Sequence, residues 1–347
     1  MHDVRIIDST LRDGSHAMSH QFTADNITRY AKGAEEAATP ILVVGHGNGL
    51  GASSLQLGVS LLSDAEMLTA AKNQLKHTKL AGFLIPGFGT IKQDIAPAIE
   101  LGMNTLIVAC HCTEATLTKQ HITYGVGKSL DVYGVLMMSH MATADELLEQ
   151  AKHMESYGVK GIILMDSAGV YFPADVTEKV GTLVSGSEVH IGFHAHNNLG
   201  LAVANTLAAV DAGATIVDCT SRGFGAGAGN CPMEVIVALL HKRGKDTGMD
   251  VYKLMDNSEN IVRTIMKKPQ EIDMVTLTSG LAGVFSGFAP HAVRAAERFG
   301  VDVRDILFEL GNRKIVAGQE DLIIEVAVYL KQKKEGKPKD FQLESLT

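Results

Sequence analysis

The chain has 347 residues, of which 46% are hydrophobic and 20% are charged, and its net charge at pH 7 is −8. This composition is typical of a globular protein, and the acidic balance argues against nucleic-acid binding, which requires a basic surface. No apolar run approaches the ~20 residues of a membrane-spanning helix, so we expect neither a membrane nor a nucleic acid as a partner.

The N-terminus mixes acidic and basic side chains, in the order Met1-His2-Asp3-Val4-Arg5. A signal peptide would instead place a basic region before an apolar stretch, so we expect a cytoplasmic protein. The four cysteines, Cys110, Cys112, Cys219 and Cys231, lack the second pair that a zinc site would need. We therefore interpret them as reduced, structural thiols, with metal binding as the less favoured alternative.

Eight short apolar or β-branched runs recur at intervals that leave room for a helix and two loops. They are Val4–Ile7, Ile41–Val44, Leu80–Ile85, Thr105–Ala109, Val132–Met137, Gly161–Met165, His190–His194 and Ile216–Asp218. Helical patterns lie between them, as in Asp145–Tyr157 and Asn198–Ala212, which end at Gly158 and Gly213. Eight alternating units predict a closed (β/α)₈ TIM barrel. An open doubly wound sheet is less favoured, because no GxGxxG motif follows the first strand.

Beyond about residue 244 the pattern becomes wholly helical. The predicted helices are Tyr252–Lys267, Ala289–Phe299, Asp302–Leu310 and Asp321–Lys331. These are too many for the last helix of a barrel alone. We therefore predict a catalytic TIM barrel in residues 1–243 and an additional C-terminal helical segment in residues 244–347, which contacts the barrel or a partner. The Lys-rich stretch 331–339 is predicted to be disordered.

Reactive side chains of such a barrel lie at the carboxyl ends of its strands. His194 and His196 end the seventh predicted strand, and residues i and i+2 of a strand share one face. Two histidines and a carboxylate form a site for a divalent ion, and Asp13 or Asp8 from the first strand could supply the carboxylate. Mixed oxygen and nitrogen ligation favours Mn²⁺, with Mg²⁺ or Co²⁺ as alternatives. The simpler interpretation is that both histidines are hydrogen-bonded polar residues at a strand end.

Three further features of the strand ends bear on chemistry. Arg12 would place a fixed cation beside Asp13, where it could stabilise an enolate or simply pair with a carboxylate. His16 lies three residues past Asp13 as a candidate general base, and His20 is the competing candidate. The glycine-rich run Arg222–Asn230 could cradle a phosphate, or its glycines could let the backbone approach a substrate or another strand closely.

Several motifs together resemble one family. DSTLRDG from residue 8, HAHNNLG from residue 194 and GAGAGN from residue 225 resemble the metallolyase superfamily of TIM barrels. The 4-hydroxy-2-oxovalerate aldolases are the members favoured by Cys112-Thr113-Glu114-Ala115, by LMMSHM from residue 136 and by GQED from residue 318. The resemblance extends from about Val4 to Tyr329.

The resemblance implies a role for individual residues. Asp13, His194 and His196 resemble the metal ligands, Arg12 the enolate-stabilising arginine, His16 the catalytic base and Ser167 the serine that helps to hold pyruvate. The family also has a tyrosine beside the C4 end of the substrate, in a stretch similar to YAGVYSSF. This chain reads LAGVFSGF from Leu281, so we expect Leu281 to border the substrate without a hydroxyl.

The activity implied by the resemblance is a metal-dependent retro-aldol cleavage of a 4-hydroxy-2-oxo acid to pyruvate and an aldehyde. Members of the family usually form a complex with an acylating aldehyde dehydrogenase, to which the C-terminal segment contributes. The alternative for the same metal site is a Claisen condensation of an acyl-CoA, as in isopropylmalate synthase. A scaffold without activity is disfavoured, because Arg12, Asp13, His16, His194 and His196 are all present.

Overall fold

The computed structural model describes residues 2–336. Its eight strands pair in parallel, in chain order, and β1 closes the sheet by pairing with β8, which confirms the predicted TIM barrel. The strands are β1 (Arg5–Leu11), β2 (Ile41–Val44), β3 (Lys79–Leu84), β4 (Thr105–His111), β5 (Asp131–Met137), β6 (Gly161–Asp166), β7 (His190–Ala195) and β8 (Ile216–Cys219).

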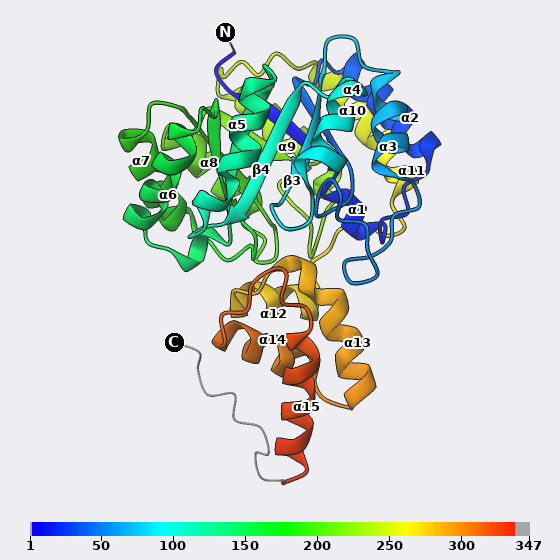
Figure 1. Cartoon of the computed structure of the whole chain (residues 1–347), viewed down its shortest axis with the longest axis vertical. Coiled ribbons are helices and arrows are strands. Elements are labelled where there is room, and N and C mark those ends of the chain that lie inside the picture. The colour runs from blue at the N-terminus through cyan, green and yellow to red at the C-terminus, as the bar shows by residue number, and fades with distance from the viewer. Residues whose placement is uncertain (1, 337–347) are drawn as a thin grey trace.

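Helices surround the barrel and then form a separate lobe beyond one of its ends (Figure 1). The barrel helices are α1 (Gly14–Ala17), α2 (Ala24–Glu36), α3 (Asp64–Lys72), α4 (Ala96–Glu100), α5 (Lys119–Gly127), α6 (Ala144–Ser156), α7 (Pro173–Gly186), α8 (Ala202–Asp211), α9 (Met233–Lys242), α10 (Val251–Asn257) and α11 (Arg263–Ile265). The lobe contains α12 (Met274–Ala282), α13 (Ala289–Phe299), α14 (Val303–Asn312) and α15 (Leu322–Lys334). Figure 1 shows this lobe at the end of the barrel opposite to the N-terminus.

Alternation along the strands produces two layers of the barrel core. On β4, Ile107 and Ala109 belong to a cluster inside the barrel, whereas Leu106 and Val108 pack against the surrounding helices. Successive side chains of a strand point to opposite faces, so a continuously apolar strand serves both layers. At the carboxyl end of β7, the same alternation directs His194 and His196 to a common face.

The apolar clusters of the structure divide the chain later than the predicted domain boundary at residue 243. Leu254, Val262 and Ile265, from α10 to α11, are part of the core formed between the barrel and its helices. A second apolar cluster begins only at Val284 and consists of residues from the C-terminal lobe. The lobe therefore begins after α11, because α10 and α11 complete the helical layer of the barrel.

Other predictions have mixed outcomes. Helix α13 has the predicted bounds, but α8 begins four residues later than expected, and α12 was not predicted. The Lys-rich stretch is helical as far as Lys334, against our prediction, and its residues 337–339 lie outside the described part of the chain.

All four cysteines are buried and free, and burial raises the pKa of each thiol. Within residues 2–336, no helix has the length and apolar character needed to cross a membrane.

Candidate active site

A buried cluster at the carboxyl end of the barrel brings together Asp13, His194 and His196. One potential ligand atom from each residue lies within 4.8 Å of the others, and all three residues are buried. Asp13 follows β1, His194 lies on β7 and His196 follows it directly, so barrel closure joins residues more than 180 positions apart. The structure thus assembles the three residues that the sequence singled out.

Both oxygens of Asp13 are held in place. Arg12 Nη1 lies 2.8 Å from Oδ1, and Asn230 Nδ2 and the backbone N–H of Ala226 donate to Oδ2 at 2.6 and 3.2 Å. Burial alone would raise the pKa of Asp13, but the neighbouring cation of Arg12 and the histidines together hold it well below its usual range. The carboxylate is therefore ionised and fixed in orientation. Sequence reasoning did not assign Asn230 a role, although this residue ends the GAGAGN motif.

A second carboxylate lies beside His194. Its Nδ1 lies 3.2 Å from Asp218 Oδ1, and the two residues are register partners on β7 and β8. The two atoms are close, but they form no hydrogen bond with each other. Burial lowers the pKa of His196 to about 3, so its ring is neutral, which is the form that binds metals.

Polar atoms of this cluster that lack a hydrogen-bond partner show whether the three residues fit a metal ion. In the part of the chain that the structure describes, His194 Nδ1 and Nε2 and His196 Nδ1 are buried and lack a hydrogen-bond partner. Buried polar atoms without partners are costly, and a bound ion is one way to satisfy them. An ionised carboxylate and two imidazole side chains match the ligands of a divalent transition ion. The donor set therefore fits such an ion.

Asp8, the alternative carboxylate, is already saturated. It accepts hydrogen bonds from Thr10 Oγ1 at 2.5 Å, from the Thr10 backbone N–H at 2.9 Å and from Tyr30 Oη at 2.6 Å. Burial raises its pKa to about 6 despite these bonds. The local network explains why Asp13, and not Asp8, belongs to the cluster.

Two nitrogen atoms of the Arg12 guanidinium form no hydrogen bond within residues 2–336. Its Cζ lies 4.5 Å from the centre of the Phe83 ring, so the guanidinium is stacked on an aromatic face. Nη1 contacts Asp13, whereas Nε and Nη2 are buried and have no hydrogen-bond partner among residues 2–336. A fixed cation with unused donors beside a metal site can stabilise a developing oxyanion.

His16 belongs to a group of three histidines beside the cluster. The rings of His20 and His46 are stacked with their centroids 3.7 Å apart, and His16 lies 5.2 Å from His20 in an edge-on arrangement. Both ring nitrogens of His46 have hydrogen-bond partners, because Nδ1 accepts from the Asn48 backbone N–H and Nε2 contacts the Gly58 carbonyl. Burial lowers the pKa of His16 below 6.5, despite the nearby Asp13 carboxylate, so its ring is neutral and basic at pH 7.

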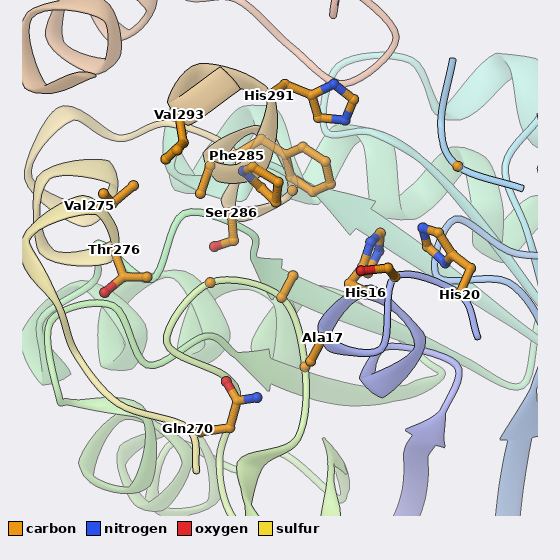
Figure 2. Close-up of a pocket in the computed structure, with 18 of the residues that line it drawn as sticks. His16, Ala17, His20, Gln270, Val275, Thr276, Phe285, Ser286, His291 and Val293 are labelled. Atoms are coloured by element: carbon orange, nitrogen blue, oxygen red, sulfur yellow. The ribbon is translucent and has the colours of Figure 1, made fainter. Parts of the chain in front are cut away.

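A cavity of about 440 Å³ opens beside His16, between the barrel and the C-terminal lobe. Figure 2 shows His16 and His20 on one side of it and Phe285, Ser286 and His291 on the other. Asp13 approaches this cavity through one of its lining residues. Gly225 lines the cavity, and a Cβ atom there would overlap Asp13 Oδ2. The glycine-rich run therefore permits close approach of the backbone, one of the two interpretations drawn from the sequence.

The structure places Leu281 away from the cavity beside His16. This side chain is 61% exposed on α12 and does not line the cavity. Phe285, four residues later, does line it and lies where the family stretch YAGVYSSF has its second tyrosine. The end of α12 and a left-handed Gly283 separate the two positions, and sequence alone could not show which one faces inward.

Ser167 lies directly after β6 and is buried. Its Oγ accepts a hydrogen bond from the Met138 backbone N–H at 2.9 Å, and its carbonyl accepts from Ser286 of the C-terminal lobe. The site thus spans the ends of β1, β6, β7 and β8, together with one segment of the lobe.

Comparison with known proteins agrees with this geometry. Residues 3–261 match the model of the HMGL-like family, and residues 270–332 match the DmpG-like communication domain. The boundary between the two matches lies close to the structural one. The carboxyl transferase domain of Rhizobium etli pyruvate carboxylase has the same fold, with a TM-score of 0.81 at 17% identity over 96% of this chain and 61% of that chain.

Relatives of known name are much closer in sequence. A 4-hydroxy-2-oxovalerate aldolase of Salinispora arenicola is 52% identical over 94% of each chain. That of Spirochaeta aurantia is 49% identical over 95% of this chain and 97% of its own. With nearly full-length matches at this level and both family models, the chain belongs to the 4-hydroxy-2-oxovalerate aldolase family.

Proposed function

We propose that this protein cleaves 4-hydroxy-2-oxovalerate, or a close analogue of it, to pyruvate and an aldehyde, with Mn²⁺ bound by Asp13, His194 and His196. The observation that carries the proposal is the buried cluster of these three residues, with Arg12 beside it. The family relatives are aldolases by name. A divalent ion in this position supplies Lewis acidity toward the 2-oxo group of the substrate.

In the proposed reaction, His16 removes the proton of the C4 hydroxyl. The C3–C4 bond then breaks, the C4 oxygen forms the aldehyde carbonyl, and the bonding electron pair becomes the pyruvate enolate. The unused donors of Arg12 face the negative charge that develops on the enolate oxygen. Protonation at C3 yields pyruvate, and the proton that His16 accepted balances the one consumed.

Support for His16 as the base comes from its position on the cavity wall and its neutral ring. Ser167 and Phe285 are proposed to contact the pyruvate and aldehyde ends of the substrate, respectively. The Claisen alternative is not favoured, because the named relatives are aldolases and the C-terminal lobe matches a communication domain. That match also supports our proposal that an acylating aldehyde dehydrogenase binds this protein and accepts the aldehyde.

The test is pyruvate release from a panel of 4-hydroxy-2-oxo acids. Protein treated with a chelator should lose activity, and Mn²⁺ should restore it more fully than Mg²⁺, because two imidazole ligands favour a transition ion. Oxygen consumption should be absent, since non-haem iron oxygenases use a similar ligand set. Full activity in a preparation verified to be free of metal would rule the mechanism out.

A further inference from the structure

Asn198 joins three segments at the mouth of the barrel. The side chain is fully buried three residues after β7. Its Nδ2 donates to the Ala168 carbonyl after β6 and to Ser286 Oγ of the C-terminal lobe, both at 2.9 Å. Its Oδ1 accepts from the Ala228 backbone N–H after β8, also at 2.9 Å. One amide group thus satisfies partners from two strand ends and from the lobe.

Ser286 extends this network to Ser167. The backbone N–H and the hydroxyl of Ser286 both donate to the Ser167 carbonyl, at 3.0 and 2.9 Å. Ser286 directly follows Phe285, which lines the cavity. The segment that carries Phe285 is therefore tied to the serine proposed to hold pyruvate, and Asn198 binds both Ser286 and Ala168, the residue after that serine.

Close packing leaves the amide little freedom. A Cβ atom at Gly227 would lie 2.6 Å from Asn198 Oδ1, and one at Gly280 would lie 3.0 Å from Asn198 Cβ. Gly227 belongs to the loop after β8, and Gly280 belongs to α12 of the lobe. Glycines of both domains therefore provide the space in which this side chain fits.

We propose that Asn198 is a positioning residue that couples docking of the C-terminal lobe to the pyruvate side of the site. Neither Asp13, Arg12 nor His16 forms a hydrogen bond with Asn198 among the described contacts. Loss of the amide should therefore disturb substrate binding more than bond cleavage. The assignment of the pyruvate side rests on the proposed function, but the docking role does not.

Amide hydrogen exchange on the full-length protein tests the docking role directly. Asn198→Ala should speed exchange both in residues 283–288 and in residues 225–229, because it removes the bonds to Ser286 and Ala228. Ser286→Ala should speed exchange only in residues 283–288. Asn205→Ala is the matched control, since Asn205 is equally buried and its amide donates to the Tyr171 carbonyl, away from the lobe. It should leave both segments unchanged.

Kinetics provide the second measurement. Asn198→Ala should raise KM for the 4-hydroxy-2-oxo acid by roughly 10-fold, the effect of unsatisfied buried partners, and change kcat much less. Combining Asn198→Ala with Ser286→Ala should add little to either change alone, because the two residues act through one network. Asn205→Ala should leave KM unaltered.

Hydrogen exchange and kinetics together distinguish the docking role of Asn198 from the proposed function. If exchange in residues 283–288 is the same in Asn198→Ala as in Asn205→Ala, the docking role is wrong. If exchange responds as expected but kcat falls with KM unchanged, coupling to the pyruvate side is wrong. If the unaltered protein releases no pyruvate, the proposed function fails, and exchange still decides the docking role. Should Asn198→Ala not fold, Ser286→Ala removes a single hydroxyl and tests the same connection.

Discussion

Arg12 and His16 lie four residues apart, and the proposed reaction requires a cation at Arg12 and a neutral base at His16. In its buried position, the Arg12 guanidinium pairs with Asp13 and is covered by the Phe83 ring. His16 stays neutral because burial disfavours its protonated form. A base and a cation can therefore act side by side at neutral pH.

Substitution should separate these two roles. Arg12→Ala should reduce both cleavage and the exchange of pyruvate methyl protons by roughly 10²–10³, because both pass through the enolate. His16→Ala should reduce cleavage and remove the rising limb of the pH profile. A base must be unprotonated and the pKa of His16 is lowered, so activity in the unaltered protein should be lost only as pH falls through a value below 6.5.

The pH–rate profiles should be measured with saturating Mn²⁺, so that the metal ligands stay occupied. His20 is the alternative base, but burial lowers its pKa to about 2, and its ring is stacked on His46. A profile that keeps its rising limb in His16→Ala and loses it in His20→Ala would transfer the role to His20.

At the scale of elements, the end of α12 decides which side chain reaches the cavity. The helix stops at Gly283, which has a left-handed conformation, and His140 contacts the Gly283 carbonyl at 3.0 Å. The chain then turns so that Phe285 faces the cavity while Leu281 remains on the outer surface of the helix. The segment from Gly283 to Ser286 is therefore the part of the lobe that shapes the site.

Phe285 gives the cavity an apolar wall where a tyrosine would offer a hydroxyl. Phe285→Tyr should sharpen stereoselectivity at C4, since one hydrogen bond worth about 0.5–1.5 kcal/mol changes an enantiomer ratio by roughly 2- to 13-fold. Leu281→Tyr is the matched control and should change nothing. Chiral analysis of the aldol products from pyruvate and a series of aldehydes measures both. Equal product ratios in Phe285→Tyr and the unaltered protein would mean that another residue controls C4.

At the scale of the whole molecule, the barrel and the C-terminal lobe have separate apolar cores, and the cluster of Asp13, His194 and His196 belongs to the barrel alone. These residues lie at the carboxyl ends of β1 and β7, which are brought together only in the closed sheet. An ion that binds the folded cluster therefore stabilises the folded barrel over the unfolded chain.

Thermal unfolding should reveal this linkage without any assay of activity. Mn²⁺ at about 100 times its dissociation constant should stabilise the barrel by about 2.7 kcal/mol and raise its unfolding midpoint. Asp13→Ala should abolish the increase, whereas Leu281→Tyr should retain it. An unfolding midpoint that does not respond to Mn²⁺ would contradict metal binding at this cluster.

The sequence by itself determined the features that follow local rules. Strand and helix periodicity predicted the barrel, because apolar positions repeat with the geometry of each element. The spacing of His194 and His196 placed both on one face, since residues i and i+2 of a strand share a face. Family motifs supplied Asp13, Arg12 and His16, and the structure brings these residues together.

Only the tertiary structure decided the features that depend on contacts between distant segments. Family motifs pointed to Asp13, but only the structure gives the physical reason why Asp8 stays out of the cluster: hydrogen bonds saturate Asp8, and the Asn230 amide, 217 positions from Asp13, orients Asp13. Phe285 replaced Leu281 at the cavity because a helix end sets the direction of the chain. Such contacts have no periodic signature, since they form only when the barrel closes and the lobe packs over its mouth.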